Sequence, residues 1–463
     1  MQSVVLNKRI SCLNFLRRFN FQRDDIPPIY HLFFCVAVTI LVYWPVFTSQ
    51  FQFSWDDQWV VLNDYTESGF NAENIGVILT SFYHGQYAPI NECFYLIIYT
   101  FFGYSSFWFH TASLLIHIGN IILVYFLFKK LLSFNTQFGI TSVRQISFIV
   151  TLFVAIHPFM VEAVSWIAAS KCILFTFFYL LALHAYFNYI IRKNYWQYGC
   201  TILFFIISFG AKEQAITMPL CLLLFDFILK RNFKSSQLWF EKLPFFCLAI
   251  CFAIITVYSQ ADNGEGVLSS RAHYPFYQDL LFGAYTVTEY LIKIILPIRL
   301  NYIYPFPNLP GEPIPAYLWF YPVLLLIVPL AFWKFWRKFW ITFGIVFFLI
   351  QISIVSNVFP TARYAIIADR YAYLPTVGVY FLLAYLLDTA LQKKSRFKYL
   401  LLCCAIVYFI CLGVYSRQRC KVWHDSITLK EELRNAIKSR SDYERLKSRR
   451  NDTTVNYLNN SKL

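Results

Sequence analysis

Long apolar runs recur along this chain and constrain its fold more than any other feature. The first begins near residue 30 and the last ends near residue 416. A helix needs about 20 predominantly apolar residues to cross the hydrocarbon core of a bilayer. A single secretory leader does not explain runs that return over most of the sequence. The pattern predicts an all-α polytopic membrane protein.

The composition agrees with a membrane location. Hydrophobic residues make up 58% of the chain and charged residues 14%, well below the roughly 25% charged residues of a soluble domain. The net charge of +15 would suggest a nucleic acid partner in a soluble protein. Here most Lys and Arg residues lie in short segments between apolar runs, where they determine membrane orientation. We therefore expect the lipid bilayer as a partner and no nucleic acid.

The apolar runs predict about eleven transmembrane helices. We place them near residues 30–49, 106–128, 146–163, 172–190, 196–211, 214–230, 243–260, 316–333, 339–357, 372–389 and 399–416. With the N-terminus inside, basic residues collect in alternate segments, as the positive-inside rule requires. Residues 279–296 are not counted as a span, because Glu289 and Lys293 lie four residues apart and suit an amphipathic helix in the outer interface. Counting them would move the C-terminal tail to the inside.

This topology divides the chain into three parts. Residues 1–28 form a cytoplasmic N-terminal segment. Residues 29–416 form a transmembrane catalytic domain, with large outer loops at residues 50–105 and 261–315. Residues 417–463 form a polar, basic tail that the eleven-span topology leaves outside.

Charged residues on the outer side have an unequal distribution. The loop from Phe51 to Tyr104 has no Lys or Arg and contains six carboxylates: Asp56, Asp57, Asp64, Glu67, Glu73 and Glu92. Three later hairpin tips instead bring cations near acids: Glu162 with Lys171, Lys212 with Glu213, and Asp369 with Arg370. Ionisable groups at membrane depth normally face a protein-lined cavity and have partners. The arrangement suits a reaction in which a carboxylate takes a proton from a hydroxyl while Lys and Arg hold a phosphate leaving group.

Several of these residues also have a purely structural interpretation. Asp57 is equally well explained as a solvated loop residue, and Lys212 and Glu213 could neutralise each other at a helix end. His110 and His117 lie seven residues apart, on one face of a helix, where hydrogen bonding in the core is more common than ligation. The 12 cysteines have no CxxC pair or Cys/His cluster at zinc-ligand spacing, so no metal site is indicated.

Six motifs in the same order resemble a known family. They are "FSWDD", "YAPIN", "FHTASLLIHIGNIILVY", "HPFMVEAVSWIAASK", "AKEQAITMP" and "DRYAYLPTVG". Each is weak alone, but together they resemble the transmembrane and tetratricopeptide-repeat-containing O-mannosyltransferases and their bacterial relatives, in the C superfamily of glycosyltransferases. The resemblance implies the glycosyltransferase C fold, with a large first outer loop that carries interfacial helices.

The chain also departs from the family pattern. Met160, Ser170, Cys172 and Asp369 stand where the family often has His, Arg, Asp and Glu. "RQRCKVWHDSITL" resembles the junction to the repeat array, but the polar tail that follows encodes no such array. Capture of a protein acceptor by helical repeats is therefore not implied.

The resemblance implies transfer of a sugar, mannose or another hexose, with inversion. The donor would be a polyprenyl phosphate sugar, such as dolichyl phosphate mannose, and the acceptor a hydroxyl of a protein or lipid. The reaction would occur on the extracytoplasmic or lumenal face of a bacterial inner membrane or endoplasmic reticulum membrane. No cofactor is required; a divalent metal is compatible with this chemistry, but no ligand cluster indicates one.

The resemblance and the charge pattern together assign roles to twelve residues. Asp56 is the expected general base, with Asp57 beside it in a supporting or structural role. The expected phosphate ligands are Arg370 and Lys212, followed by Lys171 and His157. Residues expected to support these or to bind sugar are Glu162, Glu213, Trp166, Tyr87, His110 and Tyr371.

Two other function classes fit parts of the sequence. A transporter or flippase for a lipid-linked sugar also needs charged residues in a membrane cavity, but such proteins often have inverted repeats and charges at mid-membrane depth. A noncatalytic membrane scaffold would explain Met160, Ser170 and Cys172. Sugar transfer that depends on Asp56 would separate an enzyme from both alternatives.

Overall fold

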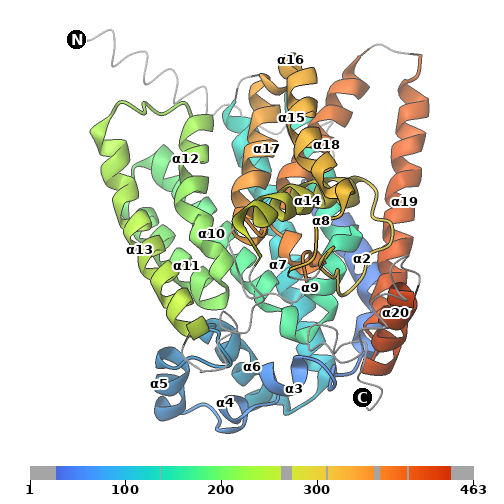
Figure 1. Cartoon of the computed structure of the whole chain (residues 1–463). Coiled ribbons are helices and arrows are strands. Elements are labelled where there is room, and N and C mark those ends of the chain that lie inside the picture. Colours follow the sequence, from blue (N-terminus) through green and yellow to red (C-terminus); the bar gives the residue numbers. More distant parts are fainter. Residues whose placement is uncertain are drawn as a thin grey trace.

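The computed structural model describes residues 28–135, 137–261, 274–308, 311–358, 365–393 and 396–438. The predicted N-terminal segment, apart from Pro28, and most of the tail lie outside these residues. Within them the chain is helical, and the β-structure consists of two isolated bridges, Tyr83 with Gln86 and Tyr304 with Ile367. The predicted all-α class is confirmed for the described part of the chain (Figure 1).

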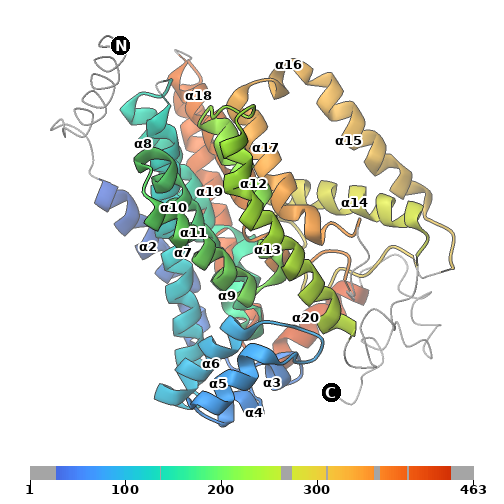
Figure 2. The ribbon, with the colours of Figure 1, turned by 90° about the vertical axis from the view of Figure 1, so that its left-hand side faces the viewer.

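Each predicted apolar run coincides with a helix. These are α2 (Pro28–Tyr43), α7 (Ser106–Phe134), α8 (Ile140–Ile156), α10 (Lys171–Arg192), α11 (Tyr195–Ala211), α12 (Met218–Ile228), α13 (Ser236–Ala261), α15 (Phe320–Ala331), α17 (Phe339–Ile352), α18 (Thr376–Gln392) and α19 (Lys398–Val422). The axes of most of these helices are roughly aligned, so the helices form a bundle (Figure 2).

Five described segments are long and apolar enough to cross a membrane: Pro28–Thr48, Ser106–Phe134, Ile167–Arg192, Ser236–Gln260 and Lys398–Val422. A sixth would be the pair Ile140–Ile156 and Pro158–Ser165, which is bent by 53°. The shorter apolar helices are Tyr195–Ala211, Ala316–Ala331, Phe339–Val355 and Thr376–Gln392. The described chain is therefore a polytopic helical membrane protein, and the count of eleven spans stays a prediction.

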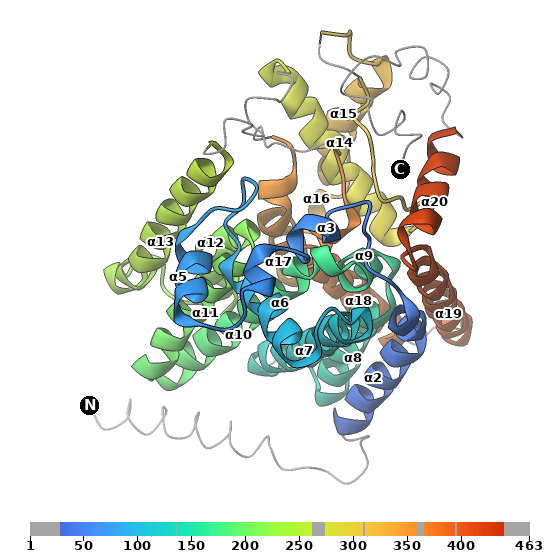
Figure 3. The same ribbon diagram turned by 90° about the horizontal axis from the view of Figure 1, so that it is seen from below.

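The first long loop, between α2 and α7, folds into four helices at one end of the bundle. They are α3 (Asp57–Val60), α4 (Asp64–Glu67), α5 (Ala72–Thr80) and α6 (Pro89–Phe102). Figure 3 views the molecule from this end, with these helices in front of the long ones. Asn63 and Asn71 begin α4 and α5, because their side-chain oxygens accept the N–H groups of Thr66 and Asn74 at 3.0 and 2.8 Å.

Helix α14 (Phe276–Ile295) lies crosswise to the long helices (Figures 1 and 2). It is not among the candidate spans, which agrees with its omission from the predicted set. The Lys293 ammonium lies 3.7 Å from the Glu289 carboxylate, which also accepts the Tyr321 hydroxyl at 3.1 Å. The two side chains therefore meet across one helical turn, and the interfacial location of α14 stays a prediction.

Helix α19 continues to Val422, beyond the predicted span end at residue 416. At the predicted end of the span, the buried Ser416 hydroxyl donates to the Ile156 carbonyl at 2.6 Å. Within the extension the Arg419 side chain is buried as well. Helix α20 (Ser426–Lys438) then packs beside the first loop, where the Gln50 N–H donates to the His424 carbonyl at 2.7 Å. The described part of the tail is thus largely helical and lies at the same end of the bundle as the first loop.

Helices α17 and α18 approach closely at two glycines. A Cβ atom on Gly344 would lie 2.7 Å from the Gly378 carbonyl oxygen, and one on Gly378 would lie 2.5 Å from that of Gly344. Small residues let helices in membranes pack backbone against backbone. This contact fixes α18, which begins directly after the "DRYAYLP" motif.

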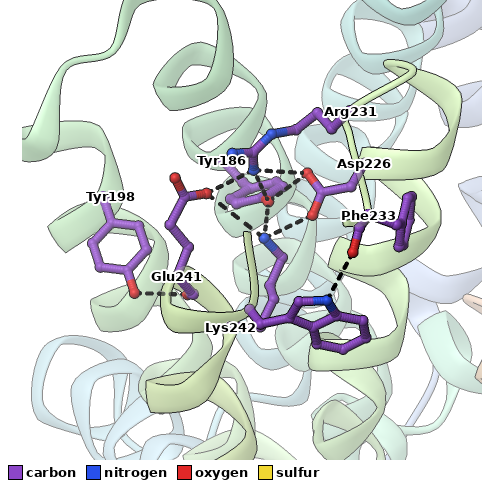
Figure 4. Close-up of polar contacts among 8 residues, drawn as sticks. Tyr186, Tyr198, Asp226, Arg231, Phe233, Glu241 and Lys242 are labelled. Carbon is purple, nitrogen blue, oxygen red and sulfur yellow. Dashed lines mark hydrogen bonds and ion pairs between the residues drawn. The ribbon is translucent and has the colours of Figure 1, made fainter. Parts of the chain in front are cut away.

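A buried charged network joins α10, α12 and α13 at the end away from the first loop (Figure 4). The Asp226 carboxylate lies 2.7 Å from the Lys242 ammonium and 3.1 Å from the Arg231 guanidinium. Arg231 also pairs with Glu241 at 2.6 Å, and the Tyr186 hydroxyl donates to Asp226 at 2.7 Å. Two cations therefore balance two anions, as burial of charge requires.

Candidate functional site

Arg370 and Glu162 come together from hairpin tips that are distant in the sequence. Glu162 lies in α9 (Val161–Ser165), and Arg370 in the short helix η7 (Asp369–Ala372) before α18. The Arg370 guanidinium pairs with one Glu162 carboxylate oxygen, and the backbone N–H of Arg370 donates to the other oxygen at 3.1 Å. The Glu162 side chain is 3% exposed and that of Arg370 is 17% exposed. The accessible member of the pair is therefore the cation.

Tyr371 lies between Arg370 and a second cation, Lys212. The Lys212 ammonium is 4.6 Å from the centre of the Tyr371 ring, and the Arg370 guanidinium carbon is 4.7 Å from it. Arg370 also lies 5.0 Å from the ring of Trp166. Aromatic faces attract cations and hold them without neutralising their charge. Two positive groups thus lie close to the ring of Tyr371.

Lys212 is buried, with 2% of its surface exposed. It lies between α11 and the short helix η4 (Glu213–Thr217), and its ammonium lies 2.9 Å from the Cys172 sulfur. Cys172 is one of the positions that depart from the family pattern, so this contact belongs to the present chain. Glu213, the next residue, is half-buried at the start of η4.

The adjacent aspartates of the first loop have different environments. Asp57 is fully buried, and its two carboxylate oxygens accept the N–H groups of Gln52 at 2.7 Å and Ala168 at 2.9 Å. Burial raises the pKa of Asp57 to about 7. Asp57 therefore fastens the start of α3 to the turn after Trp166, whereas Asp56 is partly exposed.

Tyr302 connects Asp56 with the Arg370 cluster. Its ring centre is 4.8 Å from that of Trp55, 5.3 Å from that of Trp166 and 5.4 Å from that of Trp423. Burial, and then the nearby Asp56 carboxylate, raise the pKa of the Tyr302 hydroxyl well above its usual range, while Arg370 lowers it. The hydroxyl therefore lies within electrostatic reach of both residues. Sequence reasoning missed Tyr302, because "NYIYPFP" in a long loop has no pattern that indicates a site.

Lys171 faces a different partner set. Its ammonium donates to the Gln86 side-chain oxygen at 2.6 Å and lies close enough to Glu92 to lower the pKa of that carboxyl. Lys171 and Cys172 are consecutive residues at the start of α10, and consecutive helical side chains point about 100° apart. The structure therefore separates Lys171 from the cluster formed by Arg370 and Lys212.

His157 is held by hydrogen bonds at both ring nitrogens. Its Nδ1 accepts the Phe159 N–H at 3.2 Å, and its Nε2 lies 2.9 Å from the Ile294 carbonyl oxygen. The ring begins the short helix η2 (Pro158–Met160) and connects it to α14. A role in binding phosphate would require His157 to leave one of these partners.

Two further predicted residues lie away from the Arg370 cluster. The Tyr87 hydroxyl donates to the Leu79 carbonyl at 2.9 Å and so connects α5 to the segment before α6. His110 is buried on α7, close to the backbone of Gln50. On the same helix, His117 lies 2.5 Å from the Tyr373 hydroxyl, a core hydrogen bond of the kind expected for this histidine pair.

Asp369, which replaces the glutamate of the family motif, is buried beside Arg370. Its carboxyl accepts the Tyr304 hydroxyl at 2.9 Å. Burial and the neighbouring Glu162 carboxylate raise the pKa of Asp369 to about 7. Among the described residues, no group of three or more His, Cys, Asp or Glu side chains has a geometry that could hold a metal ion.

Comparison with known proteins gives a distant relationship. The chain is 25% identical over 309 residues to "Protein O-mannosyl-transferase F38B6.6" of Caenorhabditis elegans. The match covers 64% of this chain and 41% of that protein, so the chain spans about two fifths of the length of this relative. No family model matches the chain, and no solved structure matches it.

This similarity suggests a glycosyltransferase. It agrees with the family resemblance of the six motifs, and it favours neither a transporter nor a scaffold. The apolar helices indicate a membrane protein, and the relative is named as a protein O-mannosyltransferase.

Proposed function

We propose that this chain is an inverting glycosyltransferase of the C superfamily that transfers a hexose from a polyprenyl phosphate to a hydroxyl. The acceptor hydroxyl belongs to a protein or lipid on the extracytoplasmic or lumenal face. The observation that carries the proposal is the grouping of two cations, Arg370 and Lys212, near Tyr371, with Tyr302 within electrostatic reach of both Arg370 and Asp56.

Arg370 and Lys212 would hold the phosphate of the donor. A guanidinium forms bidentate hydrogen bonds with phosphate oxygens, and an ammonium adds a compact charge. Glu162 orients Arg370 and keeps its head group on the accessible side of the pair. As the bond between the anomeric carbon and the phosphate oxygen breaks, these cations would stabilise the charge that develops on the leaving group.

Asp56 would act as the general base. The acceptor oxygen attacks the anomeric carbon, the phosphate leaves with the bonding electrons, and the hydroxyl proton passes to the Asp56 carboxylate. An ordinary carboxylate is too weak a base to ionise an alcohol beforehand, so proton transfer accompanies attack. Asp57 has both oxygens occupied by backbone N–H groups, which supports a structural role for it.

The experiment uses the full chain in lipid nanodiscs with a radiolabelled polyprenyl phosphate mannose. Asp56→Asn should lower kcat on the order of 10²- to 10⁴-fold, the usual contribution of general base catalysis. Asp64→Asn is the matched control, because Asp64 is an exposed carboxylate of the same loop, and it should retain full activity. Unchanged turnover in Asp56→Asn would remove this residue as the base. In sealed proteoliposomes, movement of the donor across the membrane without transfer would indicate a flippase instead.

A further inference from the structure

The junction between α19 and α20 contacts the loop segment that leads to Asp56. This junction, residues 423–426, consists of the three residues between the two helices and the first residue of α20. It belongs to the motif "RQRCKVWHDSITL", to which the proposed reaction assigns no role. In the loop, residues 49–52 belong to neither a helix nor a strand, and a turn at residues 53–56 leads into α3. The polar backbone groups of such a segment need partners from elsewhere in the protein.

Three hydrogen bonds join the loop segment to the junction, and in each the donor belongs to the loop. They run from the Gln50 N–H to the His424 carbonyl at 2.7 Å, from the Gln52 side-chain amide to the Trp423 carbonyl at 3.0 Å, and from the Ser54 N–H to the Ser426 hydroxyl at 3.2 Å. The donors come from alternate residues directly ahead of Asp56. The junction therefore holds this stretch along its length.

Trp423 also contacts the aromatic rings beside Arg370. Its side chain is buried, and its ring is stacked on that of Trp166 with the ring centres 5.5 Å apart and an angle of 19° between the planes. The ring of Tyr302 lies 5.4 Å from it. Arg370 lies 5.0 Å from the Trp166 ring. One residue thus holds the loop segment through its carbonyl and contacts the ring that adjoins Arg370 through its indole.

A buried cation connects α20 with the segment that carries Arg370. Arg419, in the last turn of α19, lies 3.5 Å from Glu432 of α20, and its side chain is 6% exposed. Burial and Glu162 raise the pKa of the Asp369 carboxyl, and the Arg419 guanidinium opposes that rise. Arg419 is therefore within electrostatic reach of the residue that precedes Arg370. Its charge opposes displacement of α20 relative to the short helix η7.

We propose that the junction of α19 and α20 is a positioning element, which holds Asp56 at a fixed place relative to Arg370. This inference rests on the proposed function, because it takes Asp56 as the base and Arg370 as the phosphate ligand. A base must lie within hydrogen-bond reach of the acceptor hydroxyl, and a displacement of about 1 Å can lower the rate by about 10²-fold. Glu162 holds Arg370 without help from the junction. Loss of the junction contacts should therefore lower kcat and leave donor binding unchanged.

The test removes two side-chain contacts and keeps the junction itself. Ser426→Ala removes the acceptor of the Ser54 N–H, and Gln52→Met keeps the length of the side chain but removes the donor to Trp423. The assay uses the full chain in nanodiscs with radiolabelled polyprenyl phosphate mannose. Each single variant should lower kcat about tenfold and the double variant about 10²-fold, with the donor KM within about twofold of the native value. Ser426→Thr keeps the hydroxyl and should retain most of kcat.

Hydrogen exchange reports on the hold without any need for transfer. Mass spectrometry of peptides that cover residues 49–57 should show exchange about tenfold faster in the double variant than in the native protein, because the segment opens more often. Ser68→Ala is the matched control, since Ser68 is an exposed serine of the same loop. It should leave both kcat and the exchange rate at their native values.

A native kcat per folded molecule in the double variant would overturn the inference, as would equal exchange in the native protein and the double variant. A rise in donor KM with an unchanged kcat would overturn it too, because the contacts would then act on Arg370 and not on Asp56. If the native protein transfers no sugar, the proposed function fails. Faster exchange in the double variant would in that case still show that the junction holds the loop segment.

Discussion

Glu162 binds Arg370 at two points, through its guanidinium and through its backbone N–H. One carboxylate therefore fixes both the direction of the side chain and the position of the short helix η7 that carries it. Since Glu162 is almost fully buried, it has little freedom to follow a moving partner. The pair joins the hairpin tip that contains α9 to the one before α18, and so determines where the Arg370 cation lies.

We predict that Glu162→Gln acts on donor binding through Arg370. The amide keeps the size of the side chain and one acceptor oxygen but loses the charge that orients the guanidinium. The KM for polyprenyl phosphate mannose should rise, and kcat/KM should fall on the order of 10²-fold, the usual effect of misplacing a binding group by about 1 Å. Steady-state kinetics at several donor concentrations measure this.

The matched control is Glu73→Gln, a carboxylate on the exposed side of α5, which should leave both constants unchanged. A purely structural role for Glu162 would lower the melting temperature and the amount of active protein without changing the KM of the remainder. An unaltered donor KM would therefore remove Glu162 from the positioning of Arg370.

A second prediction concerns the pH dependence of stability. The pKa of Asp57 is raised to about 7 in the folded protein, above its unfolded value of about 3.9. Between these values the folded state binds the extra proton, so the contribution of Asp57 to stability is present below about pH 4 and is lost as the pH rises towards 7. Glu92 and Asp369 have raised pKa values too and add to the same slope.

Asp57→Asn removes the share of this slope that belongs to Asp57. Melting temperatures measured from pH 4 to pH 8 should fall less steeply in the variant than in the native protein. The variant should also lose about 1–3 kcal/mol at low pH, because an amide cannot accept from both Gln52 and Ala168. Identical slopes in the two proteins would show that Asp57 does not titrate in this window.

A third prediction concerns the buried network of α10, α12 and α13. Lys242→Met leaves the Asp226 carboxylate beside only one cation and should lower the free energy of unfolding by about 3–5 kcal/mol. Asp226→Leu together with Lys242→Met replaces a charged pair by apolar side chains and should cost less than either single change. Thermal unfolding of the single and double variants gives the coupling energy.

Asp226 lies near the end of α12 that is away from the first-loop helices α3 to α6 (Figure 1). Transfer per folded molecule should therefore stay at the native rate in the double variant. A strictly additive double variant would mean that Asp226 and Lys242 stabilise the protein independently, contrary to their 2.7 Å separation.

The sequence could predict which residues meet only where topology alone brings them together. Apolar runs of the right length coincide with eleven of the helices, the spacing of Glu289 and Lys293 indicates α14, and alternate basic loops predict three acidic and cationic hairpin tips on one side. This predicted topology is sufficient to expect Glu162 near Arg370 and Lys212, because hairpin tips on one side of a bundle share one surface.

The directions of side chains could not be predicted in the same way. Lys171 lies near Glu92, while its neighbour Cys172 contacts Lys212. Consecutive helical side chains point about 100° apart, so a small error in the helix orientation would exchange the two partners. The position of Tyr302 depends on how its long loop packs against Trp55 of the first loop, which the sequence does not indicate. The network of Asp226 could not be predicted either, because two of its partners, Tyr186 and Lys242, come from other helices.

The last prediction concerns the glycine contact between α17 and α18. Gly378→Ala would place a Cβ atom 2.5 Å from the Gly344 carbonyl oxygen, so the two helices must separate. The expected cost is about 1–3 kcal/mol, as for other overpacked contacts. Because α18 directly follows Arg370–Pro375, the shift should also raise the donor KM. Gly76→Ala is the control, since a Cβ atom there meets nothing within 4 Å, and alanine in a helix should raise stability by up to about 1 kcal/mol. Melting temperatures and donor kinetics of the two variants test this, and equal values for both would mean that the helices tolerate the extra methyl group without moving apart.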